Sequence, residues 1–272
     1  MTIPQSDKKF TGYIPDTYED YFVPLLFAPY ADDLARRVPK AARHVLEIAA
    51  GTGVVTRALD AALPAAVAIT ATDLNQPMIE KAARTTPSRR AIHWRQADAM
   101  QLPFPDAAFD CVVCQFGVMF FPDKAKAFAE ARRVLQAGGT FIFNTWDRIE
   151  DNELSAAVMD AMAQQFPDNP AAFFARTPHG YYDRTDIERD LAAGGFDAAS
   201  DIVTVTLRSR AASARDAAIA FCQGSPLRNE IEERTPNGLE AATDATAAII
   251  ARRFGNRPVD AKMQAHIVTI RK

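Results

Sequence analysis

The stretch HVLEIAAGTGVVTRALDAALPAAVAITATD, residues 44–73, decides the fold of this chain. It opens with a short apolar and β-prone segment, residues 45–48, which breaks at once into the small-residue turn AAGTG, residues 49–53. Apolar residues then recur at helical spacing, and a second apolar run from Val67 ends on Asp73. The pattern predicts a β-α-β unit whose second strand closes on an acidic residue.

This unit carries the chemistry of a ligand site. Glycine at positions 51 and 53 lets a ligand lie against bare backbone, and the free N–H groups of the following helix favour an anionic group there. A carboxylate at Asp73 can accept both hydroxyl hydrogens of a ribose, each bond contributing roughly 1.5 to 3 kcal/mol. The sequence therefore predicts a nucleoside-bearing cofactor, with one polar end at the glycines and its ribose at Asp73.

The turn lacks the features of two common nucleotide sites. A dinucleotide fold has Gly-x-Gly-x-x-Gly, and the place of its third glycine is taken here by Thr56. The turn also has no Gly-Lys-Ser/Thr, which excludes a P-loop. These differences disfavour an NAD(P)-linked oxidoreductase.

The residues present resemble a different family. Glu47-x-Ala49-Ala50-Gly51-Thr52-Gly53 is similar to the first motif of class I S-adenosylmethionine-dependent methyltransferases, in which an acidic residue and a small-residue turn hold the methionine end. The usual pattern has glycine where this chain has Ala49, and members of the ubiquinone and menaquinone biosynthesis type tolerate alanine there. The resemblance continues to Trp146 through LPFPDAAFDCVVCQF, residues 102–116, which is similar to type 11 methyltransferase domains, and through EARRVLQAGG, residues 130–139.

The ends of the following strands complete the expected cofactor site. Asp98 closes a third strand, where it can accept from an adenine amine while the N–H of Ala99 meets a ring nitrogen. The resemblance implies that Leu74 and Met78 flank the adenine and that Gln115 and Phe116 border the sulfonium. The expected cofactor-binding residues are Glu47, Ala49, Ala50, Gly51, Gly53, Asp73, Leu74, Met78, Asp98, Ala99, Met100, Gln115 and Phe116.

Charge and motif absences favour a small-molecule methyl acceptor over nucleic acid. The net charge is −3, and no basic stripe is present to bind a phosphate backbone. Phe116-Gly117-Val118-Met119 stands where amino-methylating nucleic-acid enzymes carry Asn/Asp-Pro-Pro-aromatic, and Cys114 follows Val113 rather than a proline.

Composition indicates a cytoplasmic globular protein without a metal site. The chain has 272 residues, 48% hydrophobic and 24% charged, and no apolar run long enough to cross a membrane. The first dozen residues are polar and lack an apolar signal core. Cys111 and Cys114 lie inside an apolar run, which predicts buried thiols rather than a redox or zinc pair, and three cysteines suit a reducing compartment.

The resemblance implies an α/β fold: a Rossmann-like, seven-stranded, mostly parallel sheet with an antiparallel last strand, helices on both faces and helical cap insertions. The strands are expected at 45–48, 67–72, 91–97, 109–115, 140–146, 202–207 and 266–270, and a helix from Asp123 is expected to stop at Gly138-Gly139. We expect residues 1–16 to be a flexible segment, residues 17–210 and 262–272 to form the methyltransferase domain, and residues 211–261 to form a helical cap over the cleft.

The acceptor-binding residues are the least defined part of the sequence. Tyr18, Tyr21 and Phe22 crowd an expected helix, where they either pack in the core or line a lid that excludes water. Trp146, at the end of the fifth strand, and Asp147 after it are further candidates. His44 and His93 start parallel strands, at the end opposite the cofactor, and His266 lies in the edge strand. This leaves His179 as the weak candidate for a catalytic base and otherwise a surface residue.

The leading hypothesis is a methyltransferase that moves a methyl group from S-adenosylmethionine to oxygen, carbon or nitrogen of a small molecule, leaving S-adenosylhomocysteine. One alternative is a catalytically silent S-adenosylmethionine-binding regulatory protein, because the catalytic residues of this family are not constant. The other is the NAD(P)-linked oxidoreductase. The acceptor and the oligomeric state are not assigned by the sequence.

Overall fold

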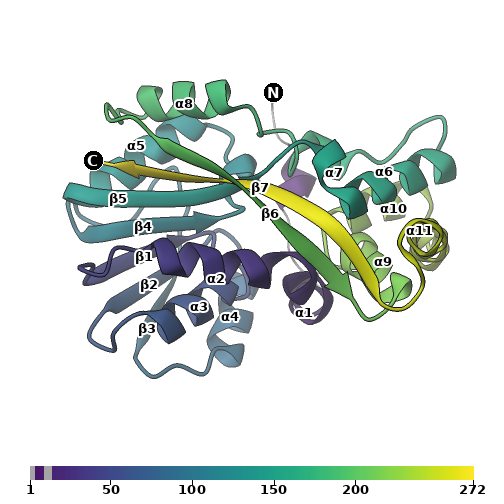
Figure 1. Cartoon of the computed structure of the whole chain (residues 1–272), viewed down its shortest axis with the longest axis horizontal. Helices are drawn as coiled ribbons and strands as arrows, with labels where there is room; N and C mark the ends of the chain where they lie inside the picture. The colour runs from purple at the N-terminus through teal and green to yellow at the C-terminus, as the bar shows by residue number, and fades with distance from the viewer. Residues whose placement is uncertain (1–3, 9–13) are drawn as a thin grey trace. The chain divides into compact units, whose positions relative to one another are not determined.

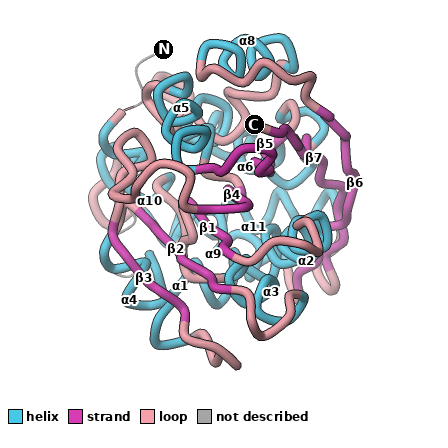
Figure 2. Tube along the Cα trace, turned by 90° about the vertical axis from the view of Figure 1, so that its left-hand side faces the viewer, coloured by secondary structure: helices cyan, strands magenta, loops and turns pink. Residues whose placement is uncertain are grey.

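A seven-stranded sheet organises the computed structural model, which describes residues 4–8 and 14–272 (Figure 1). The strands lie in the order β3-β2-β1-β4-β5-β7-β6, which runs from left to right in Figure 2. Their bounds are β1 His44–Ile48, β2 Ala68–Asp73, β3 Ile92–Gln96, β4 Phe109–Gln115, β5 Leu135–Trp146, β6 Asp201–Ala211 and β7 Val259–Arg271.

The strand directions confirm the expected mostly parallel sheet. β1 pairs in parallel with β2 and β4, β2 with β3, and β4 with β5. β7 runs the other way, because Lys272 beyond its end exchanges backbone hydrogen bonds with Gly138 and Gly139 near the start of β5. The last strand of the chain is therefore the antiparallel one, and it lies between β5 and the outer strand β6.

The central strands are apolar on both faces, as strands covered on both sides must be. Val45 and Leu46 of β1 and the run Cys111 to Cys114 of β4 are fully buried. Because those thiols are buried and unpaired, the prediction of core cysteines is confirmed.

The chain divides into two compact units. The first, here called the sheet unit, comprises residues 30–145, 181–205 and 265–272. The second, here called the helical unit, comprises residues 1–29, 146–180 and 206–264, of which 4–8 and 14–29 are the described N-terminal part. The helical unit thus takes in more of the chain than the 211–261 insertion expected from the sequence.

The helices of the sheet unit pack apolar faces made by residues three and four apart. In α3 this face includes Val55 and Leu59, and in α4 it includes Met78 and Ala82. The elements are most of α2 (Ala28–Arg37), α3 (Val54–Ala62), α4 (Gln76–Thr85), η3 (Val118–Phe120), α5 (Lys124–Val134) and α8 (Arg184–Ala193).

Helix α5 corrects one expected boundary. Asp123 caps it as predicted, its side chain accepting from the backbone N–H of Lys126 at 2.9 Å. The helix ends at Val134 instead of at Gly138-Gly139, and both glycines lie in β5. Glycine often ends a helix, but here Leu135 already has extended backbone because it pairs with Phe109 of β4.

The helical unit is built around aromatic side chains. The ring of Phe22 packs edge-on against Phe27, Phe174 and Phe221, with centroids 5.2 to 6.2 Å apart. Its elements are η1 (Gln5–Lys8), α1 (Ile14–Thr17), the π-helix η2 (Tyr18–Phe27), η4 (Ile149–Asp151), α6 (Glu153–Gln165), α7 (Phe173–Arg176), α9 (Ala214–Gln223), α10 (Leu227–Arg234) and α11 (Leu239–Phe254).

The N-terminal segment expected to be flexible is described only in part. Residues 1–3 and 9–13 lie outside the described residues. Residues 5–8 form a 3-10 helix, and the side chain of Asp7 is buried.

Candidate cofactor-binding site

The turn after β1 contains three residues with left-handed backbone. The φ angles are 57° at Ala49, 57° at Gly51 and 88° at Gly53. Gly53 is also required by packing, because a Cβ there would lie 2.9 Å from Oγ1 of Thr86 and 3.2 Å from the indole of Trp94. The glycines thus let the chain turn sharply from β1 into the start of α3, as the sequence pattern predicts.

Asp73 ties this turn to the end of β2. Its Oδ2 accepts a hydrogen bond from the N–H of Gly51 at 2.9 Å, and its Oδ1 accepts from the N–H of Asn75 at 2.8 Å. Burial raises the pKa of the Asp73 carboxyl, an effect that these bonds oppose. Each carboxylate oxygen has a second lone pair, so the group keeps capacity for a ligand hydroxyl.

Glu47 lies on β1, directly before the turn, and its carboxyl is buried. Its Oε2 accepts from the hydroxyl of Thr56 at 2.5 Å. Burial, together with the nearby charge of Asp73, raises the pKa of Glu47 to about 8. A cation placed beside this carboxyl would favour its charged form, which is the electrostatic requirement of an ammonium-binding group.

The residues of the turn fit a polar ligand group. The hydroxyl of Thr52 is buried and has no hydrogen-bond partner among the residues the structure describes. A buried hydroxyl without a partner costs free energy, roughly 1 to 3 kcal/mol, and a bound polar group would remove that cost. This observation favours a bound polar group at the turn.

The ends of β2 and β3 lie together, as the parallel sheet predicts. The N–H of Ala97 donates to the carbonyl of Asp73 at 3.0 Å, and Nε2 of Gln96 donates to the carbonyl of Leu74 at 2.8 Å. Asp98 follows at the same edge, exposed, with its Oδ1 accepting from the N–H of Met100 at 2.9 Å. Carboxylates 73 and 98 therefore both lie at the C-terminal edge of the sheet.

The apolar residues expected at the adenine differ in exposure. Leu74 is 46% exposed, which is unusual for a large apolar side chain and leaves surface for a flat ring. Met78 is 3% exposed and Ala99 is 8% exposed, so both lie mostly beneath the surface. The adenine-flanking roles of these residues stay predictions.

The end of β4 depends on a residue that the sequence analysis missed. Phe116 has a φ of 49°, and its N–H donates to Oδ1 of Asn144 at 2.7 Å. Asn144 is fully buried on β5, and its Nδ2 lies 3.5 Å from Oε1 of Gln115. The available signal was a single amide inside the apolar segment TFIFNTW, residues 140–146. Asn144 thus holds both residues expected at the sulfonium.

The two groups of predicted site residues fall in different units. All thirteen expected cofactor-binding residues lie in the sheet unit, and Tyr18, Tyr21, Phe22, Trp146 and His179 lie in the helical unit. Phe22 and Trp146 are buried, whereas Tyr21 is 37% exposed. Core packing is therefore the observed state of Phe22 and Trp146, and their acceptor-binding role stays a prediction.

His179 is buried, unlike most lone histidines in loops, and its ring orientation is defined. Its Nδ1 lies 2.7 Å from the carbonyl oxygen of Asp147, and since a carbonyl only accepts, Nδ1 carries the proton. Burial lowers the pKa of His179 to about 4, so the ring is neutral at neutral pH with a lone pair on Nε2. Such a nitrogen is a hydrogen-bond acceptor.

The described residues contain no group of three or more His, Cys, Asp or Glu side chains that could hold a metal ion. No helix among them has both the length and the apolar character needed to span a bilayer.

Comparison with known proteins agrees with this geometry. Residues 46–143 match the family model described as a methyltransferase domain. This part of the chain is similar to that family. The match begins in β1 and ends in β5, so it contains the turn, Asp73, Asp98 and Gln115. The prediction of a type 11 methyltransferase domain is confirmed.

Curated relatives resemble the same region. Ubiquinone/menaquinone biosynthesis C-methyltransferase UbiE of Rickettsia akari is 32% identical over 131 residues, which are 45% of this chain and 52% of that protein. Demethylmenaquinone methyltransferase of Thermus thermophilus is 40% identical over 113 residues, 41% of this chain and 50% of that protein. The chain thus spans about half the length of these relatives.

Solved structures share the fold at low sequence identity. The [4+2]-cyclase SpnF has a TM-score of 0.59 at 18% identity, over 100% of this chain and 97% of that chain. A Haemonchus contortus phosphoethanolamine N-methyltransferase 2, solved with S-adenosylhomocysteine, has a TM-score of 0.58 at 15% identity, over 98% of this chain and 59% of that chain. Since one neighbour is named a cyclase, the fold alone does not decide the reaction.

Proposed function

We propose that this protein is an S-adenosylmethionine-dependent methyltransferase that methylates a small molecule by in-line displacement. The observation that carries the proposal is the hydrogen bond from Gly51 to the buried carboxylate of Asp73, which holds the glycine turn beside an acid at the end of β2. The family match of residues 46–143 supports it.

Each part of the sheet unit has an assigned task in this proposal. Glu47, Thr52 and the backbone of residues 49–53 hold the methionine end, and Asp73 accepts from the ribose hydroxyls. Asp98, Ala99, Leu74 and Met78 hold the adenine, and Gln115 and Phe116 border the sulfur. When bound, S-adenosylmethionine supplies an activated methyl group whose leaving group is a neutral sulfide. The protein's contribution is therefore alignment and exclusion of water.

The helical unit is assigned the methyl acceptor. In His179, Nδ1 is held by the carbonyl of Asp147, so in the neutral ring Nε2 carries the lone pair that would accept a hydrogen bond from an acceptor hydroxyl or amine. A pKa of about 4 makes the ring a weak base, which favours orientation of the acceptor over complete removal of its proton. We assign the 211–261 region to this same task, as a cap, together with the aromatic residues Tyr18, Tyr21 and Trp146.

The acceptor class follows from the absence of a basic stripe and from the relatives. One relative is named for ubiquinone and menaquinone biosynthesis and the other for demethylmenaquinone, so a quinol-type aromatic acceptor is the first class to test. No nucleic acid is part of the proposal.

We also propose that the protein is located in the cytoplasm, because its three buried, unpaired cysteines suit a reducing compartment.

Calorimetry with S-adenosylhomocysteine tests the cofactor assignment. We expect a dissociation constant in the micromolar range and a matching rise in melting temperature. NADH and NADPH, titrated in parallel, are expected not to bind. Absence of S-adenosylhomocysteine binding would contradict the proposal, and binding of NADH instead would support the oxidoreductase alternative.

A turnover assay separates the enzyme from a silent binding protein. Transfer of radiolabelled methyl from S-adenosylmethionine is measured with hydroquinones, catechols, phenols and aromatic amines as acceptors. The proposal expects transfer to at least one of these classes. Cofactor binding without transfer to any of them would favour the regulatory alternative.

A further inference from the structure

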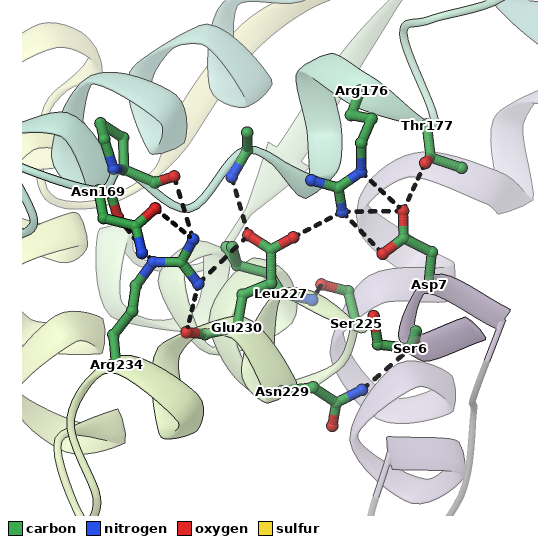
Figure 3. Close-up of polar contacts among 12 residues, drawn as sticks. Ser6, Asp7, Asn169, Arg176, Thr177, Ser225, Leu227, Asn229, Glu230 and Arg234 are labelled. Carbon is green, nitrogen blue, oxygen red and sulfur yellow. Dashed lines mark hydrogen bonds and ion pairs between the residues drawn. The ribbon is translucent and has the colours of Figure 1, made fainter. Parts of the chain in front are cut away.

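Asp7, in the short helix η1, contacts Arg176 and Thr177 (Figure 3), which precede His179 in the chain. Its carboxylate accepts from Nη2 of Arg176 at 2.7 and 2.9 Å, from Nε of the same residue at 3.2 Å and from the hydroxyl of Thr177 at 2.5 Å. Asp7 is 1% exposed and Thr177 is 3% exposed. The contact therefore lies in the interior of the helical unit although its acid comes from the start of the chain.

The opposite side of Arg176 is held by a second acid. Nη2 of Arg176 donates to Oε1 of Glu230 at 2.6 Å, and Oε2 of Glu230 accepts from the N–H of Ala172 at 2.8 Å (Figure 3). Arg234 adds a further positive charge, 3.8 Å from Glu230. The arginine at the end of α7 is thus fixed between two buried carboxylates that come from η1 and α10.

The turn after Arg176 transmits this position to His179. The N–H of His179 donates to the carbonyl of Phe174 at 2.9 Å, and the N–H of Gly180 donates to that of Thr177 at 3.2 Å. A Cβ on Gly180 would collide with the carbonyl oxygen of Arg176, so the turn is as tight as glycine allows. The backbone on both sides of the His179 side chain is therefore tied to the turn that contains residues 176 and 177.

The imidazole is held on its other side by the segment after β5. Its Nδ1 contacts the carbonyl of Asp147, and Nδ2 of Asn152 donates to the same carbonyl at 3.3 Å. The ring of Trp146 lies 6.0 Å from it, centroid to centroid. The charged groups that act on the ring are Glu150 and Asp147, and Arg176 and Asp7 lie in the preceding turn.

We propose that Asp7 is a positioning residue for the acceptor site: it fixes the Arg176–Thr177 turn so that His179 keeps its Nδ1–H on Asp147 and presents Nε2 as a hydrogen-bond acceptor. Thr177 gives Asp7 a direct link to the backbone two residues before His179. The short helix η1, residues 5–8, is then part of the functional site. The role in methyl transfer rests on the proposed function, whereas the state of the imidazole does not.

Nuclear magnetic resonance of the full chain with ¹⁵N-labelled histidine tests this. The signals of His179 are assigned by their loss in His179→Gln, and each spectrum is followed between pH 4.5 and 8. In the wild type we expect the neutral Nδ1–H tautomer throughout pH 5.5 to 8. In Asp7→Ala we expect mixed tautomers and a His179 pKa raised by about one unit or more toward its ordinary value, because the ring gains contact with water.

Three further variants isolate the contact. Asp168→Ala removes an exposed acid of the same unit, and we expect a wild-type His179 signal. Thr177→Val removes the hydroxyl link alone and should produce part of the Asp7→Ala change, whereas Thr177→Ser keeps the hydroxyl and should preserve the wild-type tautomer. If Asp7→Ala does not melt cooperatively, the comparison of the His179 spectra of Thr177→Val and Thr177→Ser tests the proposal in its place.

Identical His179 spectra in Asp7→Ala, Thr177→Val and Asp168→Ala would overturn the proposal. Calorimetry with S-adenosylhomocysteine on the same samples separates this from failure of the proposed function. Asp7→Ala is expected to bind within twofold of the wild type, because its expected target is the acceptor side. A wild type that binds no S-adenosylhomocysteine refutes the proposed function, and the tautomer comparison still decides the role of Asp7.

Discussion

The methyl group of Ala49 lies directly in front of Gly117, where a Cβ on residue 117 would approach it to 2.6 Å. The same Cβ would lie 2.7 Å from Sγ of Cys114. The side chain of Ala49, in the turn after β1, therefore packs against the backbone of Gly117, in the turn after β4. The chain accommodates alanine where the family has glycine because glycine stands on the opposite turn.

The left-handed conformation of Ala49 predicts the effect of restoring glycine. Non-glycine residues lose roughly 1 to 2 kcal/mol in this region, and glycine loses roughly 0.5 to 1 kcal/mol of backbone entropy. We expect Ala49→Gly to change the free energy of unfolding by between about 0 and 1.5 kcal/mol in the stabilising direction, as measured by urea denaturation. Ala50→Gly, at a neighbouring position without positive φ, should destabilise. A clear loss of stability in Ala49→Gly would contradict this explanation.

Replacement of Asp73 should weaken cofactor binding. We expect Asp73→Ala to raise the dissociation constant of S-adenosylhomocysteine more than tenfold with the fold retained, since the ribose loses its acceptor. The variant also leaves the N–H groups of Gly51 and Asn75 without their acceptor. Asp73→Asn keeps one acceptor oxygen and should lose less stability while still binding weakly.

Calorimetry and urea denaturation, run together, separate these two effects. The matched control is Asp123→Asn, which removes one charge from the same unit at a helix cap where asparagine serves as well. Its affinity for S-adenosylhomocysteine should equal that of the wild type. An unchanged affinity in Asp73→Ala would show that the ribose is held elsewhere.

The raised pKa of Glu47 predicts a pH dependence of stability. The native pKa is about 8 and the ordinary value is 4.5, so between these limits the folded protein holds a proton that the unfolded chain has released. Burial of Glu47 therefore lowers stability as pH rises through this window, by up to about 1.4 kcal/mol per pH unit. Glu47→Gln should remove this slope, measured as urea unfolding at pH 5 and pH 8. Equal slopes in both proteins would refute the assignment.

The side-chain amide of Asn144 should contribute to the free energy of unfolding through its hydrogen bond to Phe116, beyond the contribution of its volume. Asn144→Leu has a similar volume but leaves the N–H of Phe116 without an acceptor in the interior, which costs roughly 1 to 3 kcal/mol. The measurement is the free energy of unfolding in urea. Asn256→Leu, at an exposed position, is the control and should change stability by less than about 0.5 kcal/mol. Equal effects of the two substitutions would argue against a buried role for the amide.

Much of the sheet unit follows from local patterns. The strand, glycine turn and helix of residues 44–73 can be read from the sequence, because alternation, helical spacing and positive φ each depend on neighbouring residues. The meeting of Asp73 and Asp98 also follows, since parallel strands end at one edge of a sheet. The prediction that the helix ends at Gly138-Gly139 is wrong, because strand pairing of Leu135 with Phe109 outweighs the tendency of glycine to end a helix.

The sequence by itself determined the sheet and predicted which residues lie at the ends of its strands, since these are repeated or short-range features; the cofactor class stays a prediction from the same features. Only the tertiary structure decided that residues 4–8 join 146–180 and 206–264 in one unit, that Asn144 holds Phe116, and that Asp7 fixes the turn before His179. Each of these depends on contacts between residues far apart in the chain, 28 positions for Asn144 and Phe116 and 170 for Asp7 and Thr177. No periodicity or motif records such contacts, because they arise only when buried polar groups find partners in the folded chain.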